Sequence, residues 1–230
     1  MADSEFSRRW QRRFAQRGAT LDDDAGIAGW TATGLASRVR QFQRHWQRAA
    51  PGGGRWLDIG CGAGTYCRLL NAEGRQVVGL DYAPPSLHKA QQRSPEAIKW
   101  VAGDAQELPF RSGSFDGVLC FGVVQALEAS LPLLAEMHRV VRPGGEVWVD
   151  ALNAESLPTR FQEWRRRRAG RASHLRYVVP GDFRECAEQA GLQPLDWHWL
   201  PLVPGRLVRF QGLLESALVG GTLRRRVVKG

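Results

Sequence analysis

The chain has 230 residues, of which 43% are hydrophobic and 24% are charged, and it carries a formal net charge of +9. This length suits one sizeable α/β domain, residues 1–230, and is too short for two ordinary domains with a linker. The composition excludes a disordered chain. No stretch approaches the ~20 consecutive apolar residues of a membrane span, and the N-terminus lacks the apolar core of a secretory signal. We therefore expect a single cytoplasmic domain.

The four cysteines and five histidines indicate neither a disulfide framework nor a metal site. The cysteines lack paired Cys-x-x-Cys spacing, and no histidine has a ligand partner three or four residues away. We expect free thiols and no bound metal.

Two helices are predicted before the core, at residues 5–18 and 31–49, with a glycine- and aspartate-bearing break between Gly18 and Gly29. They would form an N-terminal helical cap, residues 1–50, which Pro51-Gly52-Gly53-Gly54 separates from the core. In residues 51–152, the predicted cofactor-binding core, short apolar runs alternate with helical patterns. Strands are predicted at 55–59, 76–81, 97–101, 115–121 and 146–151, and helices at 66–73, 85–93 and 127–140. This alternation predicts βαβ crossovers and a Rossmann-like, mostly parallel sheet with helices on both faces.

Residues 153–230 are expected to form a helical lid and the edge of the sheet. Helices are predicted at 156–168 and 181–191, and two more strands, at 193–200 and 222–229, complete a seven-stranded sheet. An amphipathic helix is predicted at 203–218, with Arg206 and Arg209 opposite its apolar stripe. Such a helix packs on a sheet or lies on a membrane surface, so peripheral membrane contact is a hypothesis for this segment.

The run Asp58-Ile59-Gly60-Cys61-Gly62-Ala63-Gly64 places three alternate glycines between a predicted strand and a predicted helix. Glycine has no Cβ, so backbone N–H groups there can approach a ligand near the positive end of the helix. The pattern indicates a nucleotide-cofactor site, although a tight structural turn alone would also explain it.

Acidic residues follow the next strands. Asp81 ends the strand at 76–81 and lies 23 residues after Asp58, where a dinucleotide fold presents a carboxylate to ribose hydroxyls. Gly103-Asp104-Ala105 follows the strand at 97–101. Ligands of open α/β sheets bind outside the carboxyl ends of the strands, so these residues are expected at one site.

These motifs, together with Leu108-Pro109-Phe110, Phe115-Asp116 and Arg142-Pro143-Gly144-Gly145, occur in the order and spacing of class I S-adenosylmethionine-dependent methyltransferases. Residues 50–152 resemble this family, and in particular its ubiquinone/menaquinone-type branch of small-molecule C- and O-methyltransferases. The resemblance implies methyl transfer as the activity and S-adenosylmethionine as the cofactor.

The resemblance also implies roles near the methionine part of the cofactor. Gly60 and Gly62, in the loop that ends at Gly64, would lie against the methionine, and Phe121 would face it. Asp58 would orient the loop and the ammonium group, or would only cap the loop.

On the nucleoside side, the resemblance implies that Asp81 accepts hydrogen bonds from the ribose hydroxyls. Asp104 would accept from the adenine amino group, and the backbone N–H of Ala105 would donate to the ring. Tyr82 would pack beside the adenine, or would be an ordinary packing residue.

A sulfonium is already an activated methyl donor, so holding the acceptor in line supplies most of the catalysis. Gln125, four residues after Phe121, is best placed to contact the acceptor but cannot take a proton. His174 is the one histidine we nominate as a base, a plain surface histidine being the alternative.

Arginines supply most of the positive charge, in clusters near the start, late in the chain and at the end. The clusters are Arg8, Arg9, Arg12, Arg13 and Arg17; Arg165 to Arg168 with Arg171; and Arg224 to Arg226. A basic surface attracts anionic partners, although it is also what an arginine-rich solvated surface would show. We expect a small or lipid-linked, anionic acceptor, with Arg165 to Arg168 and Arg171 holding its phosphate or carboxylate.

Two alternatives remain open at this point. The basic charge also suits an RNA- or DNA-directed methyltransferase. However, Cys120-Phe121-Gly122-Val123-Val124-Gln125 stands where enzymes that methylate base amines usually carry Asn/Asp-Pro-Pro-aromatic. The other alternative is a non-catalytic paralogue that only binds the cofactor. The sequence indicates no oligomeric state.

Overall fold

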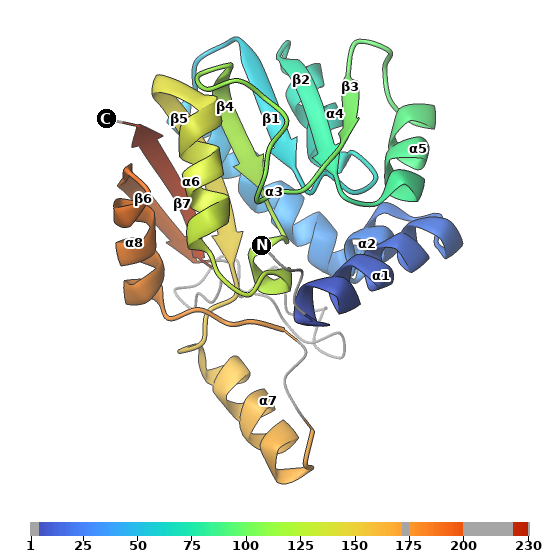
Figure 1. The fold of residues 1–230 in the computed structure, drawn as a ribbon, viewed down its shortest axis with the longest axis vertical. Helices are drawn as coiled ribbons and strands as arrows, with labels where there is room; N and C mark the ends of the chain where they lie inside the picture. The colour runs from blue at the N-terminus through green and yellow to red at the C-terminus, as the bar shows by residue number, and fades with distance from the viewer. Residues whose placement is uncertain (1–4, 172–174, 200–222, 230) are drawn as a thin grey trace.

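In the computed structural model the described residues are 5–171, 175–199 and 223–229, and they are built around one mixed sheet (Figure 1). Its order is β3-β2-β1-β4-β5-β7-β6, with β5, β4, β1, β2 and β3 pairing in parallel and β7 antiparallel to both its neighbours. The strands are β1 Arg55–Ile59, β2 Gln76–Asp81, β3 Lys99–Ala102, β4 Phe115–Cys120, β5 Val141–Ala151, β6 Leu192–Trp199 and β7 Leu223–Lys229. The predicted seven-stranded, mostly parallel sheet is confirmed.

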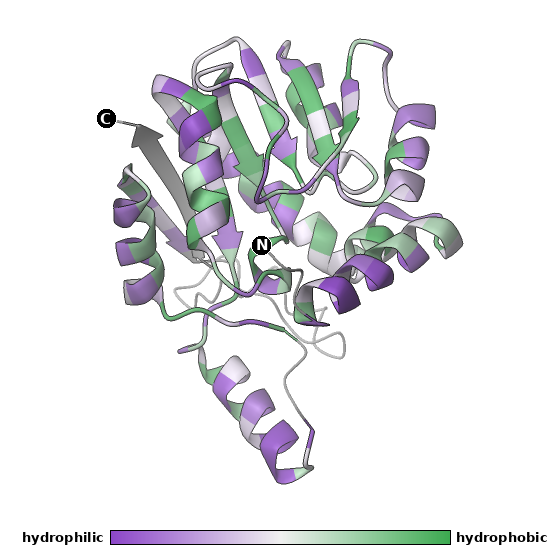
Figure 2. Cartoon of the chain, viewed as in Figure 1, coloured by the Kyte–Doolittle hydropathy of each residue, from purple (hydrophilic) through white to green (hydrophobic). Residues whose placement is uncertain are grey.

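Helices cover both faces of this sheet. The helices are α1 Glu5–Thr20, α2 Asp24–Ala28, α3 Ala32–Ala49, α4 Thr65–Ala72, α5 Pro84–Gln92, α6 Leu131–Val140, α7 Leu157–Arg168 and α8 Pro180–Gln189, with a 3-10 turn, η1, at Val124–Ala126. Figure 2 shows β1, β2 and β4 coloured mostly as hydrophobic and much of α1 as hydrophilic. Alternate residues of β1 serve the two faces: Leu57 belongs to the cluster under α6 and α8, and Trp56 to the cluster under α3 and α4.

Aromatic residues fix α3 to its face of the sheet. Phe42 and Trp46, one turn apart on α3, are both buried. The ring of Trp46 lies 4.7 Å from that of Trp56 on β1, and Phe42 lies 5.9 Å from Trp148 on β5. Burying such side chains contributes about 1.5–3 kcal/mol for each apolar one, so α3 is an integral part of the core.

The first two helices, α1 and α2, lie across the end of the sheet at which the parallel strands finish (Figure 1). Gly18 lets α1 approach α5 closely, because a Cβ at this position would lie 2.5 Å from Ser86 Oγ. The break predicted between Gly18 and Gly29 contains a short helix, α2. Asp23 caps it by accepting a hydrogen bond from the N–H of Gly26 at 2.7 Å, and Ala25 and Ile27 of the helix are buried.

Two predicted boundaries in the core were wrong by several residues. The helix predicted at 127–140 begins at Leu131, where Pro132 in the first turn sets its start, and η1 precedes it. The strand predicted at 146–151 begins at Val141, which pairs with Phe115 before the register shifts at Gly117 and Glu146. The segment from Arg142 to Gly145 is therefore an irregularity inside β5. The helix predicted at 203–218 lies outside the described residues.

Candidate cofactor site

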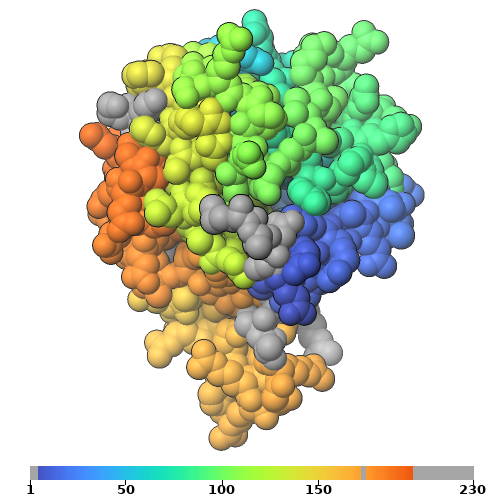
Figure 3. Space-filling view, in the orientation of Figure 1, coloured from blue at the N-terminus to red at the C-terminus, as the bar shows by residue number. Residues whose placement is uncertain are grey.

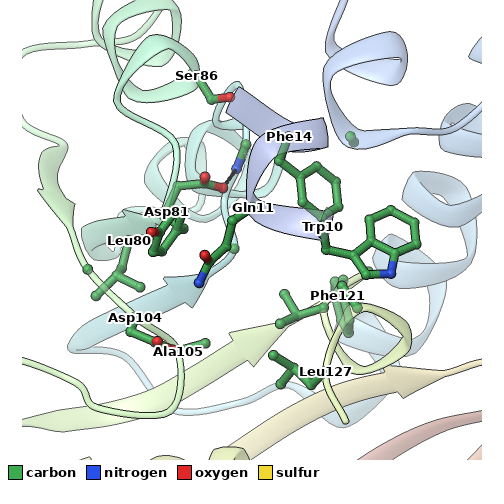
Figure 4. Close-up of a pocket in the computed structure, with 18 of the residues that line it drawn as sticks. Trp10, Gln11, Phe14, Leu80, Asp81, Ser86, Asp104, Ala105, Phe121 and Leu127 are labelled. Atoms are coloured by element: carbon green, nitrogen blue, oxygen red, sulfur yellow. Dashed lines mark hydrogen bonds between the residues drawn. The ribbon is translucent and has the colours of Figure 1, made fainter. Parts of the chain in front are cut away.

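A cavity opens at the carboxyl ends of β1 to β4, beneath α1 (Figure 4). The space inside it, including its open mouth, is about 880 Å³. Seven residues predicted for the cofactor line it: Gly60, Gly62, Asp81, Tyr82, Asp104, Ala105 and Phe121. Gly64 and Asp58 lie outside its lining.

The glycine loop after β1 needs glycine at all three positions, for different local reasons. Gly60, Gly62 and Gly64 have φ values of +70°, +52° and +83°, which side chains with a Cβ rarely adopt. A Cβ on Gly60 would lie 2.2 Å from Val123 Cγ2, whereas the nearest atom to a Cβ on Gly62 would be 3.9 Å away. Gly64 caps α4 and lies against Trp100. Gly62 is thus the position at which a ligand could meet bare backbone.

Asp81 ties this loop to the end of β2. Its Oδ2 accepts a hydrogen bond from the N–H of Gly62 and its Oδ1 accepts one from the N–H of Ala83, both at 2.8 Å. Burial raises the pKa of Asp81. Each carboxylate oxygen has a second lone pair, so Asp81 can hold the loop and still accept hydrogen bonds from a ligand's hydroxyls.

Asp58 lies behind the loop and is almost fully buried. Its Oδ2 accepts a hydrogen bond from Cys67 Sγ at 3.2 Å. Burial raises the pKa of Asp58 to about 7, and the nearby carboxylate of Asp81 adds to the shift. The structure brings Asp58 to the back of the glycine loop, where it supports α4 through Cys67.

The two ends of the cavity are formed by residues that follow different strands. Asp104 and Ala105 lie at one end and Phe121 at the other, as Figure 4 shows. Asp104 Oδ1 accepts a hydrogen bond from the N–H of Gln106 at 2.8 Å, which fixes the turn after β3. Tyr82 is 48% exposed at the cavity, so its ring has an open face.

The N-terminal helices were expected to cover the acceptor, but the cap residues that line the cavity wall were not predicted from the sequence. Trp10, Gln11 and Phe14 extend from α1 over the cavity, and Trp30 follows α2 (Figure 4). The spacing of Trp10 and Phe14, one helical turn apart, was the signal available for this role. Because these side chains are part of the wall, the docked cap encloses one side of the cavity.

Ion pairs and hydrogen bonds hold the cap in place. Asp24 on α2 pairs with Arg68 of α4 and accepts a hydrogen bond from Thr65 Oγ1 at 2.6 Å. Asp22 pairs with Lys89 of α5 at 3.0 Å. Asp24 thus joins the cap to α4 through a partly buried pair, and Asp22 contacts α5 through an exposed one.

A buried ion pair that no sequence pattern indicated supports the far end of the cavity. Arg38 of α3 pairs with Asp150 near the end of β5, and both side chains are 2% exposed. Asp150 also accepts a hydrogen bond from the N–H of Gly122 at 2.7 Å, and the guanidinium of Arg38 lies 3.8 Å from the ring centre of Trp30. The pair thus positions both the loop after β4 and a cap residue.

Gln125 lies at a second, smaller hollow beside the first. It is 5% exposed on η1, and its amide nitrogen donates a hydrogen bond to the carbonyl of Gly122 at 2.7 Å. The hollow is lined by Arg13 and Arg17 of α1 and shares Trp10, Phe14, Ala28 and Trp30 with the cofactor cavity. Gln125 does not line the cofactor cavity itself.

The remaining candidates lie elsewhere. His174 falls outside the described residues, and Arg165 to Arg168 are on α7, none of whose residues is buried or lines either hollow. Within the described ranges, no group of three or more His, Cys, Asp or Glu side chains could hold a metal ion. No helix among the residues described is long and apolar enough to cross a membrane.

Comparisons with known proteins agree with this geometry. A methyltransferase domain model matches residues 57–149. The malonyl-[acyl-carrier protein] O-methyltransferase of Serratia marcescens is 37% identical over 114 residues, which are 49% of this chain and 44% of that protein. The demethylmenaquinone methyltransferase of Beutenbergia cavernae is 38% identical over 114 residues, 47% of each chain. The chain thus spans less than half the length of these relatives.

A solved structure shows the same fold. The S-adenosylmethionine-dependent methyltransferase from Mesorhizobium loti superposes with a TM-score of 0.62 at 18% identity, covering 79% of this chain and 94% of that one. The strand order, the glycine loop and the matched motifs all agree with a methyltransferase domain. Through this domain the chain belongs to the class I S-adenosylmethionine-dependent methyltransferases, as its resemblance to the family implied.

Proposed function

We propose that the protein transfers a methyl group from S-adenosylmethionine to an oxygen or carbon atom of a small or lipid-linked, anionic acceptor. The observation that carries this proposal is the pair of adjoining hollows, one lined by the glycine loop and the acids, the other by two arginines. A donor site and an acceptor site that share a wall are what a group-transfer reaction needs.

The cavity residues fit the cofactor. In this proposal Asp81 accepts hydrogen bonds from the ribose hydroxyls, and Gly62 allows the methionine part to approach the backbone. Asp104, Ala105 and Tyr82 hold the adenine. When bound, the cofactor supplies an activated methyl group on a sulfonium, so the protein's own task is to position the acceptor and exclude water.

The second hollow fits an acceptor that carries a phosphate or carboxylate. Arg13 and Arg17 lie one turn apart on α1 and both line it, and guanidinium groups pair with such anions in bidentate geometry. Trp10 and Trp30 offer apolar walls, and the buried Gln125 offers an amide for orientation. The names of the two relatives specify a malonyl group on a carrier protein and demethylmenaquinone as their acceptors. The malonyl group carries a carboxylate of the kind that this hollow fits, whereas demethylmenaquinone is lipid-linked but carries neither anion.

The test is to incubate the purified protein with methyl-labelled S-adenosylmethionine and fractionated cell extract, with and without nuclease. We expect label in a small-molecule or lipid fraction, unaffected by nuclease and absent with Asp81→Ala. Nuclease-sensitive label in RNA would contradict the proposal and favour a nucleic-acid acceptor.

Once an acceptor fraction is found, Arg13→Gln with Arg17→Gln should raise its Michaelis constant and spare cofactor affinity. The matched control is Arg8→Gln with Arg12→Gln, because these exposed arginines lie on the same helix and line neither hollow. Equal effects of the two pairs would exclude the arginine hollow as the acceptor site.

A further inference from the structure

Helix α7 exposes its largest apolar side chains. It follows β5 at the end of the sheet where the cofactor cavity opens, and it projects from the body of the molecule (Figures 1 and 3). Leu157 is 78% exposed, Phe161 60% and Trp164 50%. These residues are spaced four and three apart, so they form one stripe along the helix.

The helix turns its polar side towards the protein. The partly buried residues of α7 are Thr159, Glu163 and Arg166, and Glu163 lies 3.7 Å from Arg166 in an ion pair. A surface helix that only packs on a core has the opposite orientation, with its apolar stripe inward. The outward stripe is therefore not explained by packing against the residues that the structure describes.

Arginines border the stripe along its length. Arg165 and Arg168 lie over the rings of Phe161 and Trp164, with 6.0 Å and 4.6 Å to the ring centres. At 100° per residue, Arg165 lies on one flank and Arg160 with Arg167 on the other. The exposed face is thus a stripe of Leu, Phe and Trp with arginines on both flanks and with Arg168 at its C-terminal end.

We propose that α7 binds in the interface of a lipid bilayer that carries anionic head groups. In such an interface, Leu, Phe and Trp enter the boundary between head groups and acyl chains, while arginines beside them contact phosphates. The charge complementarity selects an anionic bilayer. Nucleic acid fits this face less well, because a row of phosphates along the helix would meet the exposed side chains of Leu157, Phe161 and Trp164.

This binding would direct the end of the molecule that holds both hollows towards the lipid. It goes beyond the proposed methyl transfer and does not depend on it, because vesicle binding is measured without cofactor or acceptor. It also assigns a role to Arg165 to Arg168, which line neither hollow.

The test is co-sedimentation of the full chain with vesicles of phosphatidylcholine containing phosphatidylglycerol, compared with pure phosphatidylcholine. One variant removes the stripe, Phe161→Ser with Trp164→Ser, and one removes a charge from each flank, Arg165→Gln with Arg167→Gln. The matched control is Arg44→Gln with Arg48→Gln, two exposed arginines one turn apart on α3. None of these residues is buried, so melting temperatures should remain close to wild type.

We expect wild type to bind the anionic vesicles and the control to bind equally well. Binding should be at least about tenfold weaker with either α7 variant, because each arginine at the membrane surface and each ring inserted into the bilayer contributes to it. The proposal is overturned if the anionic vesicles do not bind, or if both α7 variants bind like the control. It is also overturned if Phe161→Ser with Trp164→Ser removes RNA binding or self-association but leaves vesicle binding intact.

Discussion

At the scale of single residues, Asp81 is the most important for the proposed cofactor site, because it holds the glycine loop and also lines the cavity. Asp81→Ala removes acceptors for the N–H groups of Gly62 and Ala83 and the proposed acceptor for the ribose. We expect affinity for S-adenosylhomocysteine to fall by about 1.5–3 kcal/mol, the range for hydrogen bonds to a charged group. Calorimetric titration measures this, with the exposed carboxylate variant Glu96→Ala as the control; equal affinity in all three proteins would remove Asp81 from the site.

Asp58 gives a prediction about pH. Its pKa is about 7 in the folded protein against 3.8 as the ordinary value, so the folded state retains a proton that the unfolded state has lost. The contribution of Asp58 to the free energy of unfolding therefore falls as the pH rises from 3.8 to about 7, and it is constant above that range. Asp58→Asn should be less stable than wild type by a smaller margin at pH 8 than at pH 5, or more stable at pH 8. Urea denaturation at both pH values checks the sign, and an identical difference at the two values would refute it.

Gly60 and Gly74 separate backbone strain from steric overlap. Both have positive φ, +70° and +77°, but a Cβ on Gly74 meets no atom within 4 Å, whereas one on Gly60 meets Val123. Gly74→Ala should lower the free energy of unfolding by about 1–2 kcal/mol, the cost of a left-handed residue with a Cβ. Gly60→Ala should lower it further and weaken cofactor binding. Equal losses of stability in the two variants would show that Val123 moves aside without lowering the free energy of unfolding.

The cavity residues that lie at the ends of the parallel strands were predictable from the sequence. Glycines and acids at strand ends are recognisable because the topology brings all strand ends to one edge. The roles of Arg38 and Trp10 were not predicted, because they depend on how α1 and α3 cross the sheet. No local sequence pattern specifies that crossing. Gln125 was expected at the acceptor, and its place at the second hollow leaves that role a proposal.

At the scale of elements, the docking of α2 on α4 sets the integrity of the cavity. Asp24→Asn weakens the ion pair with Arg68 and the hydrogen bond from Thr65. We expect a loss of about 1–2 kcal/mol in unfolding free energy and weaker cofactor binding, because α1 and α2 carry part of the wall. Limited proteolysis should cut the cap faster in this variant.

Asp22→Asn is the matched control for this prediction. Asp22 is 88% exposed and its pair with Lys89 is solvated, so its loss should change stability and binding little. If Asp22→Asn weakened cofactor binding as much as Asp24→Asn, overall charge on the cap would explain the effect better than the contacts of Asp24.

Element boundaries were predictable where apolar periodicity ended at a turn signal, as at β2, whose range matched its prediction. They were missed where a strand extends beyond its apolar run. Val141 pairs with the sheet although Pro143 and Gly144, which are turn signals, follow it. The short helix α2 was missed because its stability comes from the Asp23 cap and contacts with the core. Such features depend on tertiary partners that a local pattern does not contain.

At the scale of the whole molecule, the fold was predictable because strand and helix patterns alternate through residues 51–152 and restrict the topology to a parallel sheet. The orientation of α7 could not be read in the same way. An outward apolar stripe and an inward one have the same periodicity, and only the structure distinguishes them.

The most direct measurement is calorimetric titration of S-adenosylhomocysteine into the full chain in the presence of EDTA. The structure predicts binding at one site per chain, unaffected by the chelator, since within the described ranges no cluster of metal ligands is formed. An absence of binding, or binding that requires a divalent cation, would contradict the assignment of the cavity to the methyl donor.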